Sequence, residues 1–159
     1  MKKFLEKIKP RLLIMCLIAG FWLIVIILRL VFAEYQSAYI NEIYKPPFYP
    51  PVFVFYLVWG LTLIGLTVST VLAVFKSKNK NLIVIIIFNG VLNILLPLFF
   101  YTLRSKISGV IILLFLIISA ISLFKMLLKI KHWYAYITIP YLMWLAFLIA
   151  LNYAILMIN

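Results

Sequence analysis

Very few side chains in this sequence could carry out acid–base or metal chemistry. The chain has one histidine, His132, one cysteine, Cys16, and three acidic residues, Glu6, Glu34 and Glu42. General acid–base catalysis needs histidine or carboxylates gathered in a site. A single cysteine also excludes a disulfide scaffold or a thiolate metal cluster within one chain. We therefore expect no dedicated catalytic residues and no metal site.

The remaining chemistry lies in amides and aromatic rings embedded in apolar sequence. Residues 140–159 read PYLMWLAFLIALNYAILMIN, and Tyr141, Trp144 and Leu148 recur there at helical spacing, with Asn152 continuing the same face. Amides and large aromatic rings are tolerated in hydrocarbon mainly where they face other protein or a ligand. This face therefore packs against other helices or lines a binding pocket, and the sequence leaves both interpretations open.

A second polar feature lies in the middle of another apolar stretch. Asn93 precedes Pro97 by four residues, so the N–H that would have bonded the Asn93 carbonyl in a helix is missing. A neighbouring helix, a water or a ligand has to satisfy the freed carbonyl and the nearby amide. An interhelical hydrogen bond with a kink would suffice, although Asn89, one turn earlier, slightly favours a cavity.

The composition indicates which elements must position these residues. The chain is 68% hydrophobic and 11% charged, with a mean hydropathy of +1.24, which is far outside the range of soluble proteins. Five apolar stretches are long enough to cross about 30 Å of hydrocarbon as helices. We therefore predict an all-α integral membrane bundle of five transmembrane helices, a single domain over residues 1–159, with spans near 12–33, 52–75, 82–103, 107–128 and 133–158.

The basic residues predict how this bundle is oriented. If the five spans alternate, most lysines and arginines fall at one end, namely Lys2, Lys3, Lys7, Lys9, Arg11, Lys76, Lys78, Lys80, Lys125, Lys129 and Lys131. The other end has only Lys45, Arg104 and Lys106, with Arg29 just inside the first span. By the positive-inside rule the N-terminus is cytoplasmic and the C-terminus outside. The net charge of +12 is thus explained by topology rather than by nucleic-acid binding.

One long connection is predicted, at residues 34–51, EYQSAYINEIYKPPFYPP. Four prolines at positions 46, 47, 50 and 51 disfavour helix until the chain has passed them. The aromatic residues of this segment could form a belt at the headgroup level. We favour the alternative, a lid over the outer mouth of the bundle, because long loops in compact domains are more often functional than spacers.

Three sequence blocks resemble the TspO/MBR family of tryptophan-rich sensory or translocator proteins, over roughly residues 37–159. They are the segment from Lys45 to Pro51 followed by Trp59, the pattern Leu-Asn-x-x-Leu-Pro-x-x-Phe at 92–100, and the final apolar helix. The chain departs from the family pattern at several of these positions. It has Phe48, Leu63, Ile94, Leu96 and Leu148 where Trp, Phe, Gln, Trp and a small residue are usual, Ile40 where an aromatic residue is frequent, and no acid in span four.

The resemblance implies a membrane receptor for flat hydrophobic ligands, namely porphyrins (protoporphyrin IX or haem), sterol-like compounds or isoquinoline-type drugs. It would have a sensory, regulatory or transport role and would need no cofactor. The alternatives are a porphyrin or lipid transporter and a light-dependent porphyrin-degrading enzyme that uses Trp59 and Trp144. The resemblance and the pattern together predict twelve ligand-binding residues: Tyr39, Ile40, Lys45, Pro50, Trp59, Leu63, Asn93, Leu96, Phe100, Trp144, Leu148 and Asn152.

The resemblance also predicts partners for the chain, and the composition suggests a location. A homodimer is expected, with Gly90 and small residues near Ala120 as candidates for its seam, alongside membrane lipid and no nucleic acid. The many isoleucines and lysines suggest an AT-rich bacterium and hence a plasma membrane. Trp59 and Trp144 are expected to form facing walls of one pocket, and Lys45 at its mouth could pair with a ligand carboxylate.

Overall fold

The computed structural model describes residues 2–77 and 79–159, without the side chains of residues 2–9 and 33–38. The described chain is all-helical, and five of its helical segments are long and apolar enough to cross a membrane. Those candidate spans are Pro10–Phe32, Val52–Lys76, Lys80–Thr102, Lys106–Ile130 and His132–Ile158. The prediction of a five-helix membrane bundle is therefore confirmed.

The spans lie side by side and close a ring in the order α1, α2, α6, α4, α3. The helices are α1 (Lys2–Glu42), α2 (Val52–Lys76), α3 (Lys80–Pro97), α4 (Lys106–Ile130), α5 (His132–Tyr136) and α6 (Ile139–Ile158). Helices satisfy most of their backbone hydrogen bonds internally, as lipid requires. The buried side chains of all five spans form one core inside the ring.

The first helix is longer than predicted, and the lid loop is correspondingly shorter. α1 continues to Glu42, so the predicted loop at residues 34–51 is wrong for residues 34–42, and the non-helical connection is 43–51. Residues 34–42 contain no glycine or proline to stop a helix. The pair Pro46–Pro47 disfavours helix only from the residue that precedes it.

The third span changes from α-helix to π-helix directly after Pro97. A five-residue π-helix, η1 (Leu98–Thr102), follows α3 directly. It ends at Thr102, and Leu103 is its C-cap residue. Arg104 follows with a φ of 53°, in the left-handed region, and the amide of Ser105 donates to the Phe99 carbonyl over 3.0 Å. This pattern, with a left-handed residue directly after the C-cap residue, resembles a Schellman cap. Short π segments often occur at functional sites.

The last span is broken, although the sequence analysis predicted one continuous helix over 133–158. α5 ends at Tyr136 and α6 begins at Ile139. Pro140 in the first turn of α6 has no N–H to continue the earlier helix. The hydroxyl of Thr138 instead donates to the Ala135 carbonyl over 2.7 Å, which stabilises the turn between the two helices.

Two positions proposed for a dimer seam are occupied by contacts within the chain. Gly90 is buried, and a Cβ built on it would lie 2.3 Å from Cζ of Phe21 on α1. Ala120 on α4 is also buried, at 4% exposure. Because these small residues pack helices inside one bundle, they are not available to a second copy. Ser122, another small residue near Ala120, is only partly buried, and both the homodimer and its seam stay predictions.

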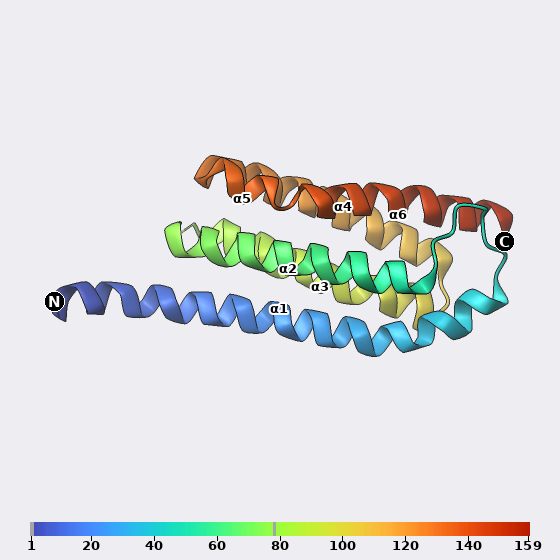
Figure 1. The fold of residues 1–159 in the computed structure, drawn as a ribbon, viewed down its shortest axis with the longest axis horizontal. Coiled ribbons are helices and arrows are strands. Elements are labelled where there is room, and N and C mark those ends of the chain that lie inside the picture. Colours follow the sequence, from blue (N-terminus) through green and yellow to red (C-terminus); the bar gives the residue numbers. More distant parts are fainter. Residues whose placement is uncertain (1, 78) are drawn as a thin grey trace.

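The ends of the bundle differ in the way that the charge pattern predicts. The N-terminus, the α2–α3 connection and the α4–α5 connection lie at one end, while the C-terminus and residues 43–51 lie at the other (Figure 1). The basic end therefore carries Arg11, Lys76, Lys80 and the lysines near His132. Lys2, Lys3, Lys7, Lys9 and Lys78, which belong to the predicted basic end, have side chains outside those described. Which end is cytoplasmic stays a prediction.

Candidate ligand-binding site

A buried polar network joins three helices in the middle of the bundle. The amide nitrogen of Asn93 donates to the Tyr141 hydroxyl over 2.8 Å and to the Asn89 carbonyl over 2.9 Å. The Tyr141 hydroxyl donates to Oδ1 of Asn89 over 3.1 Å, and the Asn89 amide donates to the Ser119 hydroxyl over 2.7 Å. The interhelical hydrogen bond that the sequence left as one possibility is therefore present. Oδ1 of Asn93, although buried, has no partner among the described residues.

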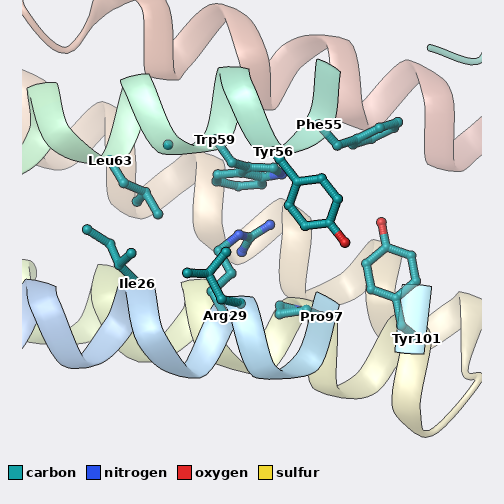
Figure 2. A pocket seen from close by; sticks show the side chains of 10 residues that line it. Ile26, Arg29, Phe55, Tyr56, Trp59, Leu63, Pro97 and Tyr101 are labelled. Atoms are coloured by element: carbon teal, nitrogen blue, oxygen red, sulfur yellow. The ribbon is translucent and has the colours of Figure 1, made fainter. Parts of the chain in front are cut away.

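The carbonyl that Pro97 leaves free is bonded by an arginine from another helix. Nη1 of Arg29, on α1, donates to the Asn93 carbonyl oxygen over 2.7 Å. The same guanidinium lies over the indole of Trp59, with Cζ 3.4 Å from the ring centroid. A cation on the face of an indole is stabilised by about 0.5–2 kcal/mol. Arg29 thus connects α1, α2 and α3 at one point, and Figure 2 shows its guanidinium beside the Trp59 indole.

Aromatic rings from α2 and α6 surround this point. Trp59 and Trp144 meet edge to face, with ring centroids 6.2 Å apart and planes at 89°. Phe55 lies 5.5 Å from Trp144, and Tyr141 lies 6.3 Å from Trp59, between ring centroids. The two indoles are therefore brought together as predicted, but in direct contact rather than across a gap. Nε1 of Trp144 is buried without a partner in the described structure.

Two small cavities flank the contact between Arg29 and Trp59. We call the first the lateral cavity: it measures about 60 Å³ and lies between α1, α2 and the end of α3 (Figure 2). The second, the central cavity, measures about 10 Å³, room for about one water. The lateral cavity is lined by Ile26, Arg29, Leu30, Phe55, Tyr56, Trp59, Gly60, Leu63, Pro97 and Tyr101, and the central cavity by Arg29, Trp59, Leu96, Phe100, Tyr101, Leu148 and Asn152.

Residues 43–51 cross the end of the bundle and are attached to α6. The backbone N–H of Tyr44 donates to Oδ1 of Asn159 over 2.8 Å, and Nδ2 of Asn159 donates back to the Tyr44 carbonyl over 3.0 Å. Tyr49 packs on Phe55, with centroids 5.4 Å apart, and Phe55 lines the lateral cavity. The segment therefore lies across this end of the bundle (Figure 1) and packs on the aromatic cluster through Tyr49, an arrangement in keeping with a lid.

The predicted site residues fall into three groups in the structure. Six line a cavity: Trp59, Leu63, Leu96, Phe100, Leu148 and Asn152. Asn93 and Trp144 are buried beside those residues, and Tyr39 and Ile40 are buried near the end of α1, where the Tyr39 ring lies 5.8 Å from that of Phe100. Burial raises the pKa of the Tyr39 phenol above its ordinary value, so it stays neutral.

Two predicted residues lie away from both cavities. Lys45 is exposed, and its Nζ donates to Oδ1 of Asn41 over 3.3 Å. Pro50 is partly buried in the loop. Neither is among the residues that line a described cavity. Because α1 extends to Glu42, the loop begins nearer the end of the bundle, and Lys45 faces outward there.

Arg29 is the residue that the sequence analysis missed. The charge pattern uses it only as one of the residues that set topology, although it lies inside the candidate span Pro10–Phe32. An ionisable side chain inside a membrane span is by itself a signal of a functional site. Tyr56 and Tyr101, which also line the lateral cavity, carry no such signal, because tyrosines are common at membrane interfaces.

The described residues contain no group of three or more His, Cys, Asp or Glu side chains that could hold a metal ion. His132 lies at the basic end of the bundle, far along the molecule from residues 43–51 (Figure 1). The groups that gather at the candidate site are aromatic rings, apolar side chains, a few buried polar atoms and one guanidinium.

These features define an integral membrane protein, a bundle of five helical spans with a partly polar, aromatic interior. The chain belongs to the TspO/MBR family, whose family model matches residues 12–158. A search of curated proteins gave no match.

Proposed function

We propose that this protein binds flat apolar ring compounds, with porphyrins the leading candidates, at the aromatic cluster of Trp59 and Trp144. The observation that carries the proposal is the position of Trp59. Its indole lines both cavities and touches Tyr141 and Trp144. Indole and phenol rings stack on flat macrocycles, and apolar walls bury them. The free Oδ1 of Asn93 and Nε1 of Trp144 are buried polar atoms that such a ligand could satisfy.

Binding requires that side chains move. Cavities of about 60 and 10 Å³ are far smaller than the few hundred Å³ typical of ligand pockets. Leu96 and Leu148, where the family pattern has tryptophan and a small residue, both line the central cavity. We expect a porphyrin to displace Leu148 and to separate α6 from α3, so its affinity depends on how easily these helices part.

The test is a titration of purified protein with protoporphyrin IX, followed through the porphyrin's own absorbance. We expect saturable binding, weakened roughly fivefold or more by Trp59→Leu because a stacked ring is lost. Trp133→Leu is the control, since Trp133 is exposed near the basic end. Equal affinity in all three proteins would refute the site, and no saturable binding by the wild type would refute the function.

Two further arms of this experiment separate a receptor from the alternative functions. Illumination of the complex that bleaches the porphyrin, and does so only when Trp59 and Trp144 are present, would favour a degrading enzyme. Movement of porphyrin across reconstituted vesicles that depends on the protein would favour a transporter. A receptor is expected to show binding with neither effect.

A further inference from the structure

Arg29 is a positive charge at membrane depth, and its described partners are uncharged. Its guanidinium donates one hydrogen bond to the Asn93 carbonyl and lies over the Trp59 ring. The one salt bridge among the described side chains joins Arg104 to Glu42 at the end of the bundle. A guanidinium has five N–H donors, and a charge within a membrane span is costly unless it is paired.

The lateral cavity gives this guanidinium a route to the outside of the bundle. Arg29 is partly buried and lines the cavity together with apolar residues of α1 and α2. Leu30 and Tyr56, which also line it, are 54% and 42% exposed. A Cβ built on Gly60 would meet no atom within 4 Å, so α2 leaves this side open. Because both helices are candidate spans, the opening faces lipid.

Guanidinium chemistry then specifies what fits. The planar fork of arginine matches a carboxylate with two parallel, charge-assisted hydrogen bonds. A ligand that comes from the membrane and carries a carboxylate on an apolar body would neutralise Arg29 and place its body against Trp59. We propose that the lateral cavity recognises the carboxylate of an apolar ligand through Arg29, and that this ligand enters from lipid between α1 and α2.

This inference rests on the proposed function and narrows its ligand class. It also replaces the role predicted for Lys45. Lys45 is exposed and bonded to Asn41, outside both described cavities, whereas Arg29 lies between them. A carboxylate-bearing ring compound is thus expected to be held at membrane depth, not at the mouth.

The experiment compares protoporphyrin IX, which has two carboxylates, with its uncharged dimethyl ester in lipid nanodiscs. The ratio of the two affinities is measured for the wild type, Arg29→Gln and Lys45→Gln, because each porphyrin's partition into lipid cancels between variants. We expect the ratio to fall about tenfold or more in Arg29→Gln and to persist in Lys45→Gln. Arg29→Lys, which keeps a charge but loses the fork, is expected to retain part of the preference.

The possible failures are distinguishable. A ratio unchanged in Arg29→Gln, or lost in Lys45→Gln instead, would overturn this inference and leave the proposed function standing. No binding of either porphyrin by the wild type would overturn both.

A second measurement needs no variant, in case Arg29→Gln does not fold. Decanoate is expected to displace the porphyrin ester from the wild-type protein, and decyltrimethylammonium, with the same chain length and opposite charge, is not. Equal displacement by the two amphiphiles would contradict a carboxylate site. Displacement by decyl phosphate but not by decanoate would assign the guanidinium to phosphate and overturn the proposal as stated.

Discussion

The hydroxyl of Tyr141 and the amide nitrogen of Asn93 lie 2.8 Å apart, 48 residues from one another in the sequence. Together with Asn89 they join α6 to α3 in the core of the bundle. This contact makes the position of Asn93, and through its carbonyl that of Arg29, depend on the last helix.

Removing the Tyr141 hydroxyl should destabilise the bundle. Tyr141→Phe removes one buried acceptor from the Asn93 amide and one of the two donors to Oδ1 of Asn89, which keeps only its bond from Asn93. The expected loss is about 1–2 kcal/mol, because interhelical hydrogen bonds in membranes contribute modestly. Thermal unfolding in detergent measures it. Tyr153→Phe on the same helix is the control, since Tyr153 is 60% exposed; equal midpoints for the two variants would contradict the role of the network.

Gly109 on α4 has no side chain, and the Phe100 ring occupies the space that a Cβ would need. A Cβ built on Gly109 would lie 2.4 Å from Cδ2 of Phe100 and 3.1 Å from its Cβ. Because the added methyl group would also press on Cβ of the buried Phe100, a rotation of the ring would not relieve the contact. Gly109→Ala is therefore expected to cost about 1–3 kcal/mol through overpacking, seen as a lower melting temperature.

The matched control for this substitution is Gly20→Ala. A Cβ on Gly20 would meet no atom within 4 Å, and alanine favours helix over glycine. Gly20→Ala should leave the melting temperature unchanged or raise it. If both glycine variants behave alike, the close approach of α4 to Phe100 is not the reason for a glycine at position 109.

Enlarging the central cavity should strengthen porphyrin binding while it weakens the fold. Leu148 is 4% exposed and lines that cavity. Leu148→Ala removes the side chain that a macrocycle would have to displace, so we expect tighter binding together with a stability loss of about 2–5 kcal/mol. Absorbance titration and thermal unfolding measure the two effects on the same protein.

Leu145→Ala separates cavity size at the site from general loosening of α6. Leu145 is fully buried on the same helix but lines neither described cavity. Its substitution should cost similar stability without a gain in affinity. Tighter porphyrin binding by Leu145→Ala as well would mean that flexibility, rather than room beside Leu148, limits binding.

The attachment of the loop to α6 should be visible in hydrogen exchange. Asn159→Ala removes both hydrogen bonds to the backbone of Tyr44. We expect faster exchange of the amides in residues 43–51, since exposed segments without such bonds open readily. Asn41→Ala, which removes only an exposed bond to Lys45, is the control. Unchanged exchange in Asn159→Ala would show that other contacts hold the loop.

The sequence predicts the spans and the polar centre because both depend on local patterns. Hydropathy predicts all five candidate spans to within two residues at each end, and the spacing of Asn93 and Pro97 identifies a carbonyl in need of a donor. The donor itself was not predictable. Arg29 is 64 residues away, and no local pattern pairs it with that carbonyl.

The errors at helix ends have a related cause. The continuation of α1 to Glu42 and the break before α6 depend on which prolines end a helix, and at which residue each of them does so. The prolines at 46 and 47 act only from the residue before them, so residues 34–42 stay helical. At the other position, Pro140 and the Thr138 hydroxyl together end one helix and start the next. The direct contact of Trp59 with Trp144 depends on helix packing, which spacing along one helix does not specify.

The unbroken length of α1 has a mechanical consequence. Its 41 residues correspond to about 60 Å at 1.5 Å per residue, twice the thickness of the hydrocarbon. It is therefore a single rod that reaches past both faces of the membrane and carries Arg29 partway along its length. Because Arg29 lies on α1 and Trp59 on α2, the contact between guanidinium and indole depends on the angle at which this rod crosses α2.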